Sequence, residues 1–207
     1  AEKMVDSSFM ELAANSVGLA AGAALLTLFL ALFMAYGKRL RPSPMVGLAV
    51  RVAGMGYAVP GTVIAVGVML PFAWFDNTLD SWMRDQWGVS TGLLLSGTLF
   101  ALLFAYAVRF LAVSIQAVEG GLGRIRPSMD DAARSLGLKP RRVLQQIHMP
   151  LMRGTLLTAI LLVFVDVLKE LPATLILRPF DFNTLAVRAF ELASDELTGI
   201  DMARALT

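Results

Sequence analysis

The stretch PSMDDAARSLGLKPRRVLQQIHMP, residues 127–150, is the most polar and most basic part of an otherwise apolar sequence. It begins with a helix-start signal, because Ser128 and Asp131 have the S-x-x-D spacing of a capping box. Gly137 stands where a left-handed residue would end that helix. We therefore expect a short first helix between Ser128 and Gly137. Three small or apolar residues are predicted to share one of its faces: Ala132, Ala133 and Leu136.

A second helix is predicted to begin at Pro140, a residue that suits the first turn of a helix. Pro150 disfavours helical geometry at the residue before it, so this helix should end at Met149. Its apolar residues recur on one face: Val143, Leu144 and Ile147. The stretch is thus predicted to form a compact polar hairpin with small alanines in front, charge around them and an apolar back.

The rest of the sequence has the composition of a membrane protein. Of its 207 residues 57% are hydrophobic and only 16% are charged, against about 25% charged in average globular domains. The mean hydropathy is +0.67. The charges are clustered, and long uncharged runs separate them. We expect an all-α polytopic membrane protein with about four transmembrane helices, over residues 12–36, 56–75, 89–111 and 155–177.

Basic and acidic segments alternate along the chain. Segments 37–51 and 120–153 carry an excess of Lys and Arg, whereas 1–11, 76–88 and the tail after Leu177 carry more acids than bases. The positive-inside rule therefore predicts that both ends lie outside and that the 127–150 hairpin is cytoplasmic. No basic region precedes an apolar core near residue 1, so no signal peptide is expected, and the chain is expected to be a piece of a longer protein.

The hairpin resembles the cytoplasmic EAA loop of permease subunits in binding-protein-dependent (type I) ABC importers. That pattern reads E-A-A, three residues, G, nine residues and I-x-L-P; here it stands as Asp131-Ala132-Ala133, Gly137 and Ile147-His148-Met149-Pro150. Asp131 replaces Glu and Met149 replaces Leu. The resemblance implies one MetI-like transmembrane domain over residues 1–207, a coupling loop over 124–153, and a last helix beyond residue 207.

A second similarity concerns the solute. Lys169-Glu170-Leu171-Pro172-Ala173-Thr174, Thr184-Leu185-Ala186-Val187-Arg188 and Gly56-Tyr57-Ala58-Val59-Pro60-Gly61 are similar to the C-terminal half of ferric-iron permeases. This likeness implies a multi-pass protein of the bacterial inner membrane. The implied partners are a periplasmic solute-binding protein, a cytoplasmic ATPase dimer that binds ATP and Mg²⁺, and a second or fused N-terminal permease half.

The resemblance also implies which residues contact the ATPase. They are Asp130, Asp131, Ala132, Ala133, Arg134, Leu136, Gly137, Ile147, Met149 and Pro150. The sequence has no G-x-x-x-x-G-K-[ST] loop, so we expect no ATP hydrolysis, no cofactor and no catalytic residue in this chain. His148 is the single histidine, and no metal site is expected around it. A basic hairpin lying on the membrane surface is the alternative interpretation of the same stretch.

Three charges occur in the last predicted membrane helix: Asp166, Lys169 and Glu170. In a continuous helix they would share one face, which should point toward protein or water because a charge at mid-bilayer costs about 2.5–3.5 kcal/mol. Two interpretations stay open: a structural ion-pair network, or a wall of the translocation path. The acidic tail around Glu191, Asp195 and Glu196 is either a solvated surface or a docking site for an external partner.

Other functions remain open on the sequence. An importer of the same superfamily for thiamine, sulfate, polyamine or phosphonate would have the same hairpin and a different external partner. An ion-coupled secondary carrier would use the three intramembrane charges, and its uptake would collapse with the proton gradient. A membrane scaffold without transport would leave those charges unexplained. Neither the pI nor the net charge of +2 points to nucleic acid as a partner.

Overall fold

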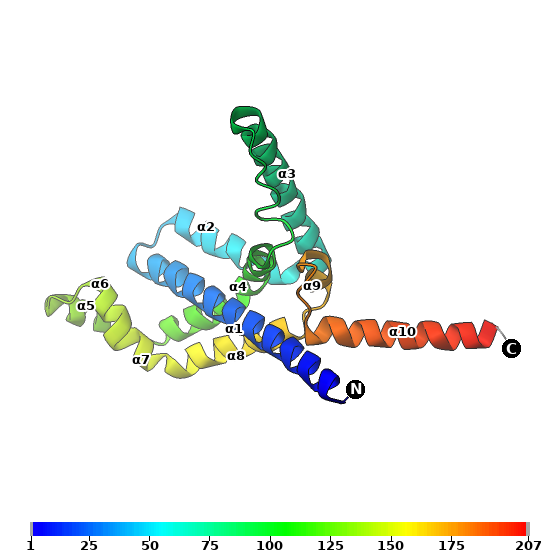
Figure 1. Ribbon diagram of the computed structural model, residues 1–207. Coiled ribbons are helices and arrows are strands. Elements are labelled where there is room, and N and C mark those ends of the chain that lie inside the picture. Colours follow the sequence, from blue (N-terminus) through cyan, green and yellow to red (C-terminus); the bar gives the residue numbers. More distant parts are fainter. Residues whose placement is uncertain (1, 206–207) are drawn as a thin grey trace. The chain divides into compact units, whose positions relative to one another are not determined.

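The computed structural model describes the backbone of residues 2–205 and the side chains of residues 9–195. Within these ranges the regular structure is entirely helical, with no strand (Figure 1). The chain divides into two compact units. Unit 1 comprises Ala1–Ala20, Gly61–Ala105 and Leu168–Thr207, and unit 2 comprises Ala21–Pro60 and Tyr106–Val167.

Three of the described helices are long and apolar enough to cross a membrane, over Phe9–Leu40, Gly61–Trp87 and Leu99–Gly123. They belong to α1 (Glu2–Leu40), α3 (Gly61–Trp87) and α4 (Leu99–Gly123). A fourth crossing exists if Pro140–Leu151 and Arg153–Leu168, which meet at an angle of 79°, form one broken span. The expected all-α polytopic architecture is therefore confirmed.

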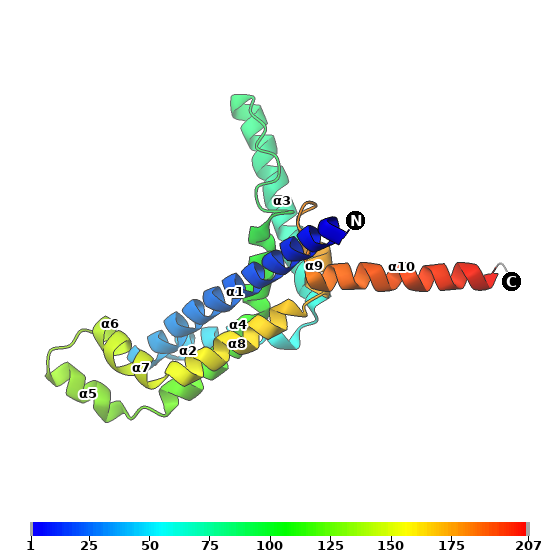
Figure 2. The ribbon, with the colours of Figure 1, turned by 60° about the horizontal axis from the view of Figure 1, so that its bottom comes forward.

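Unit 2 is built on the packing of α4 and α8 (Arg153–Leu168) against the second half of α1 (Figure 2). α2 (Pro44–Ala53) adds Val50 to the same core; its N-cap is Ser43, whose Oγ accepts the Val46 N–H at 3.3 Å. A 3-10 turn, η1 (Gly56–Ala58), follows. Aliphatic side chains and one methionine fill this core: Leu28, Ala31, Ala35, Val50, Ile115, Val118, Leu122, Ile125, Met152, Leu156 and Ala159.

The 124–153 segment of unit 2 folds into short helices beyond the ends of α4 and α8 (Figure 1, Figure 2). They are α5 (Pro127–Ser135), α6 (Pro140–Val143), the π-helical turn η2 (Leu144–His148) and α7 (Met149–Leu151). The predicted hairpin is present in the structure, and its second arm runs without interruption from Pro140 to Leu151.

In unit 1, α3 packs against α9 (Pro172–Leu177). Phe72 of α3 stacks on Phe100 at the start of α4, with 6.0 Å between ring centroids. The N-terminal part of α1 is tied to the start of α10 (Leu185–Ala205), because the Leu185 N–H donates a hydrogen bond of 2.9 Å to Ser16 Oγ.

The boundaries of α3 and α4 differ from the predicted 56–75 and 89–111. α3 begins at Gly61 and continues through Pro71 to Trp87, and α4 begins only at Leu99. Two acids of the acid-rich 76–88 segment account for the difference. Asp80 Oδ1 accepts the backbone N–H of Thr91 at 2.7 Å, and Asp76 Oδ2 accepts that of Ser96 at 2.7 Å. Both acids lie on α3 and hold the non-helical 88–98 segment to it.

The predicted helix 155–177 is interrupted. α8 ends at Leu168, and α9 begins at Pro172. Pro172 lacks an N–H and its ring clashes with the carbonyl four residues earlier, which is that of Leu168, so the helix cannot pass this point regularly. As a result Lys169 and Glu170 lie outside α8, and the expectation of one continuous charged helix face was wrong.

Candidate functional site

The turn between the two arms of the hairpin is rigidly built. Gly137 has φ +77°, in the left-handed region that favours glycine. The Leu138 N–H donates to the Ala133 carbonyl at 3.0 Å, and the Gly137 N–H donates to the Arg134 carbonyl at 2.9 Å. These two bonds are the pair that defines a Schellman motif, which ends a helix and fixes the direction of the next segment. The predicted role of Gly137 is confirmed.

Two predicted helix ends were wrong. Arg126 occupies the N-cap position of α5 without a side-chain cap, and Pro127 takes N1, so Ser128 lies inside the first turn. Proline is favoured at N1 because its fixed φ suits a helix and its missing N–H is not needed there. At the other end Pro150 does not stop the helix. The preceding turn is π-helical, with the Met149 N–H bonded to the Leu144 carbonyl, and a changed hydrogen-bond pattern tolerates a proline.

The faces of α5 are also divided differently from the prediction. Ala133 is buried, as is Asp130 one turn earlier, whereas Ala132 and Leu136 are exposed. Leu136 is 81% exposed and Met129 is 40% exposed. Since residues three and four apart share a helix face, Met129, Ala132 and Leu136 form one exposed apolar strip. We call these three residues the α5 strip.

The remaining predicted contact residues lie around this strip. Asp131 and Arg134 are exposed and 3.6 Å apart, a pair that contributes little to stability. Ile147 is half-buried, and Met149 and Pro150 are exposed on the second arm. Asp130 is different from its neighbours, because its side chain is only 12% exposed and points into the unit.

Asp130 lies at the centre of a buried polar cluster. Its Oδ2 accepts a hydrogen bond of 2.8 Å from Arg39 Nε, and its Oδ1 lies 2.7 Å from Nε2 of His148. An ionised carboxylate only accepts hydrogen bonds, so the proton of this second contact lies on Nε2. Tyr36 packs its ring edge-on against the His148 ring, with 5.5 Å between centroids, and its hydroxyl donates to the Pro140 carbonyl at 2.7 Å. We call Tyr36, Arg39, Asp130 and His148 the clamp.

Burial and hydrogen bonding act in opposite directions on Asp130. Burial raises the pKa of its carboxyl, whereas the hydrogen bonds and charge of Arg39 and the hydrogen bond of His148 lower it. The lowering effects are together the larger, so the pKa lies below its ordinary value of 3.8. Asp130 is therefore a stable anion at neutral pH, in balance with the Arg39 guanidinium.

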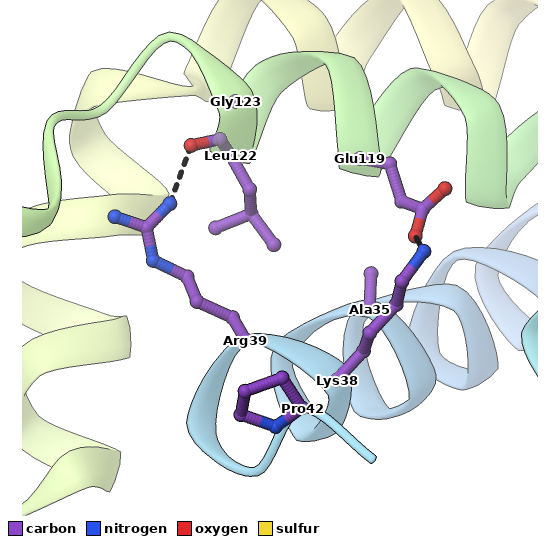
Figure 3. A pocket seen from close by; sticks show the side chains of 7 residues that line it. All are labelled: Ala35, Lys38, Arg39, Pro42, Glu119, Leu122 and Gly123. Carbon is purple, nitrogen blue, oxygen red and sulfur yellow. Dashed lines mark hydrogen bonds and ion pairs between the residues drawn. The ribbon is translucent and has the colours of Figure 1, made fainter. Parts of the chain in front are cut away.

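The guanidinium of Arg39 also holds the end of α4. Nη1 donates to the Leu122 carbonyl at 2.5 Å, and Nη2 donates to the Ile125 carbonyl at 2.9 Å. The neighbouring Lys38 instead pairs with Glu119 of α4 at 2.6 Å (Figure 3). Between these two contacts lies a pocket of about 320 Å³, lined by Ala35, Lys38, Arg39, Pro42, Glu119, Leu122 and Gly123 (Figure 3).

Sequence reasoning missed the clamp, although it placed His148 correctly on the second arm. His148 is fully buried and Arg39 comes from another helix, far away in the sequence. The available signal was weak: a basic residue in the last turn of α1, an acid beside the EAA-like motif, and a single histidine. Nothing in their spacing indicates that they meet.

The intramembrane charges have separate partners. The Tyr57 hydroxyl donates to Asp166 Oδ2 at 3.3 Å in unit 2. In unit 1, Glu170 is buried and its Oε1 accepts the Ala173 N–H at 3.3 Å, at the start of α9. Lys169 is exposed. A carboxylate at a helix start is favourable, so Glu170 has a structural role in addition to any role in transport.

Comparison with known proteins identifies the family of the chain. Residues 27–190 match the model of the family described as binding-protein-dependent transport system inner membrane component. The chain belongs to this family. The permease is accordingly a multi-pass protein of the bacterial inner membrane and a transport component, and the matched range includes all of the 124–153 loop.

Several curated relatives are similar to the permease. The Fe(3+)-transport system permease protein FbpB 2 of Haemophilus influenzae is 26% identical over 189 residues, which are 91% of this chain and 34% of the relative. The putative 2-aminoethylphosphonate transport system permease protein PhnV of Salmonella typhimurium is 27% identical over 135 residues, 65% of this chain and 45% of the relative. The chain thus spans between a third and a half of the length of these relatives.

Proposed function

We propose that this permease forms part of the membrane channel of an ATP-driven importer and that α5 couples it to a cytoplasmic ATPase dimer. The observation that carries the proposal is the α5 strip of Met129, Ala132 and Leu136. The three side chains form one contiguous exposed apolar strip on a loop that is otherwise charged, and contiguous exposed apolar surface is a feature of interaction sites. It has the form of a helix that inserts into an apolar groove of a partner.

The rigid turn at Gly137 and the buried clamp support the same role. A coupling element must move as a body, because a flexible loop would absorb the displacement that the ATPase generates. The Schellman turn fixes one end of α5, and Asp130 fixes its inner face. ATP and Mg²⁺ would be bound by the ATPase, and this chain would hold neither.

The proposed coupling is tested by cross-linking in membranes that contain the ATPase subunit. Ala132→Cys, on the α5 strip, should form a cross-link to the nucleotide-hydrolysing subunit with a short bifunctional reagent. Met45→Cys is the matched control, because Met45 is 83% exposed on α2 but lies outside the hairpin. If the Ala132→Cys variant never captures the ATPase, or if Met45→Cys captures it equally, the proposed insertion of α5 into a groove of the ATPase is wrong.

For the solute we propose ferric iron delivered by a periplasmic binding protein. The support is the similarity to the Haemophilus influenzae Fe(3+)-transport permease over 91% of this chain. Phosphonates are the second candidate, because the similarity to the Salmonella typhimurium 2-aminoethylphosphonate permease is of comparable strength. Reconstituted vesicles with each loaded binding protein and internal ATP distinguish them: uptake of radioactive Fe(III) supports the first, and uptake of labelled 2-aminoethylphosphonate the second.

The same vesicles test the ion-coupled carrier. Uptake that persists without an ATPase subunit and stops when the proton gradient is dissipated would overturn the importer. In the importer, Asp166, whose carboxylate accepts a hydrogen bond from the Tyr57 hydroxyl, stays a candidate for the translocation path. We assign Glu170 to structure, because its Oε1 accepts the Ala173 N–H in the first turn of α9, and Lys169 stays a candidate for the path.

A further inference from the structure

The basic end of α1 is attached to the 124–153 loop at several points, although about 90 residues separate them in the sequence. Arg39 alone reaches three acceptors: the Asp130 carboxylate on α5 and the carbonyls of Leu122 and Ile125 at the end of α4. Tyr36, one turn earlier, reaches the Pro140 carbonyl at the start of the second arm. Both arms of the hairpin are therefore bound to α1.

The geometry of this attachment requires an arginine. The guanidinium is a planar group whose donors point in fixed directions, and here Nε, Nη1 and Nη2 each meet a different acceptor within 2.9 Å. A lysine keeps the charge but places one ammonium where three donor positions are needed. The Arg39 side chain is only 17% exposed, so solvent cannot replace the lost bonds easily.

The adjacent ion pair of Lys38 and Glu119 is an ordinary surface contact with which the buried Arg39 contacts can be compared. Lys38 and Glu119 join the same two helices, α1 and α4, but their side chains are 40% and 36% exposed. Exposed pairs of this kind contribute little, because water screens them and long side chains lose entropy. Lys38 and Arg39 thus form a natural pair for comparison: same charge, same turn, different burial.

We propose that α1 is a third attachment of the 124–153 loop, besides the flanking helices α4 and α8, and that Arg39 is the positioning residue that makes α5 and the end of α1 move as one body. The proposal rests on the proposed function, in which α5 receives the motion of the ATPase. It adds that this motion reaches the membrane through α1 as well, so that α1 is part of the moving body and not a passive neighbour.

The experiment measures the distance between α1 and α5 directly. The 207-residue sequence contains no cysteine, so spin labels can be placed at two chosen positions. Arg41→Cys, just after α1, and Ser135→Cys, on α5, are both exposed. With Arg39 present, double electron–electron resonance should give one narrow distance distribution. The same distribution is expected in the nucleotide-free and in the ATP-trapped complex.

Arg39→Lys should broaden this distribution, whereas the control Lys38→Gln should leave it narrow. Asp130→Asn is the second variant, because it removes the charge without changing the shape of the side chain, and it should broaden the distribution in the same way. In transport, we expect the uptake per ATP hydrolysed to fall roughly tenfold or more in Arg39→Lys, as expected when charged hydrogen bonds that hold the coupling position are lost. A merely structural role would lower uptake and hydrolysis together.

Two results would overturn the inference: a narrow, wild-type distribution in Arg39→Lys and Asp130→Asn, or a wild-type distance that changes when ATP is trapped. The first comparison needs only the permease, so it decides the attachment even without a partner. Failure of the wild-type permease to form any complex with an ATPase would instead count against the proposed function, while the comparison of Arg39→Lys with Lys38→Gln still stands.

Discussion

Nε2 of His148 lies 2.7 Å from Oδ1 of Asp130, and 18 residues separate the two in the sequence. The contact joins the two arms of the hairpin, since Asp130 belongs to α5 and His148 to the π-helical turn of the second arm. His148 is fully buried. The orientation of α5 thus depends on a residue that the EAA pattern treats as variable.

Two replacements of His148 should distinguish the effect of its hydrogen bond on stability from the effect of its size. His148→Leu leaves the buried Oδ1 of Asp130 without its donor and should destabilise the permease by roughly 1–3 kcal/mol. His148→Gln retains an N–H donor on a side chain of similar reach and should recover most of the loss. Thermal unfolding of the detergent-solubilised variants measures both. Equal stability of His148→Leu and wild type would show that the contact is not needed.

The two neighbouring alanines of α5 should respond in opposite ways to the same change. Ala133→Glu places a charge at a position that is 3% exposed and should destabilise the fold by roughly 3 kcal/mol, because an unpaired charge is buried. Ala132→Glu lies on the exposed strip and should leave the melting temperature nearly unchanged while abolishing coupled uptake. Melting and solute uptake of both variants test this. Normal uptake by Ala132→Glu would contradict the insertion of α5 into a groove of the ATPase.

The stability of the clamp should depend on pH in one direction only. The pKa of Asp130 is lowered in the folded protein relative to 3.8, so its contribution is fully present above that value and is lost as the pH falls through the folded pKa. A spin label at Ser135→Cys should therefore keep the same mobility from pH 7 to pH 5 and become more mobile only below 3.8. The Asp130→Asn variant is the control, and it should lack this acid transition.

The turn at Gly137 offers a test of backbone conformation alone. A Cβ at this position meets no atom within 4 Å, but its φ of +77° is unfavourable for alanine. Gly137→Ala should therefore cost roughly 1 kcal/mol. Gly37→Ala in α1, which has equally open surroundings and no positive φ, should be neutral or slightly stabilising. Equal melting temperatures for the two variants would argue against a strained turn.

Gly56 contrasts with Gly137, because a larger residue is excluded at Gly56 by lack of space and not by the backbone angle φ. A Cβ here would overlap the carbonyl oxygen of Val108 on α4, a backbone atom that cannot rotate away. Gly56→Ala should push η1 from α4 and destabilise unit 2 by on the order of 3 kcal/mol. Gly47→Ala, with nothing within 4 Å, is the matched control. Melting curves that coincide for the two variants would contradict this packing.

The parts of the structure that follow from local patterns were predictable. Long uncharged runs indicated the membrane helices, and Gly137 and Pro140 marked the turn and the start of the second arm. The boundaries were not predictable where tertiary contacts decide them. Asp76 and Asp80 look like solvated loop acids until the backbone of residues 88–98 is seen to bind them.

The sequence predicted where the site lies, but only some of the residues that form it. The motif located α5 but could not say that Ala133 faces inward and Ala132 outward, because this depends on what packs against the helix. The clamp was not predictable, because its arginine comes from a helix about 90 residues away in the sequence. A single sequence does not indicate which distant residues are in contact. Pro172 is a local signal for the end of α8, and it leaves Lys169 and Glu170 outside that helix.

The π-helical turn at Leu144–His148 decides which way the His148 ring faces. A π-turn accommodates one more residue than a regular α-helical turn, so it sets the rotational phase between Pro140 and Pro150. The same residues wound as a plain α-helix would carry the imidazole about 100° further around the helix axis. Its ring would then leave the interior, and the acid on the first arm would face a different neighbour. The spacing of nine residues in the motif is in this sense a rotational setting as much as a distance.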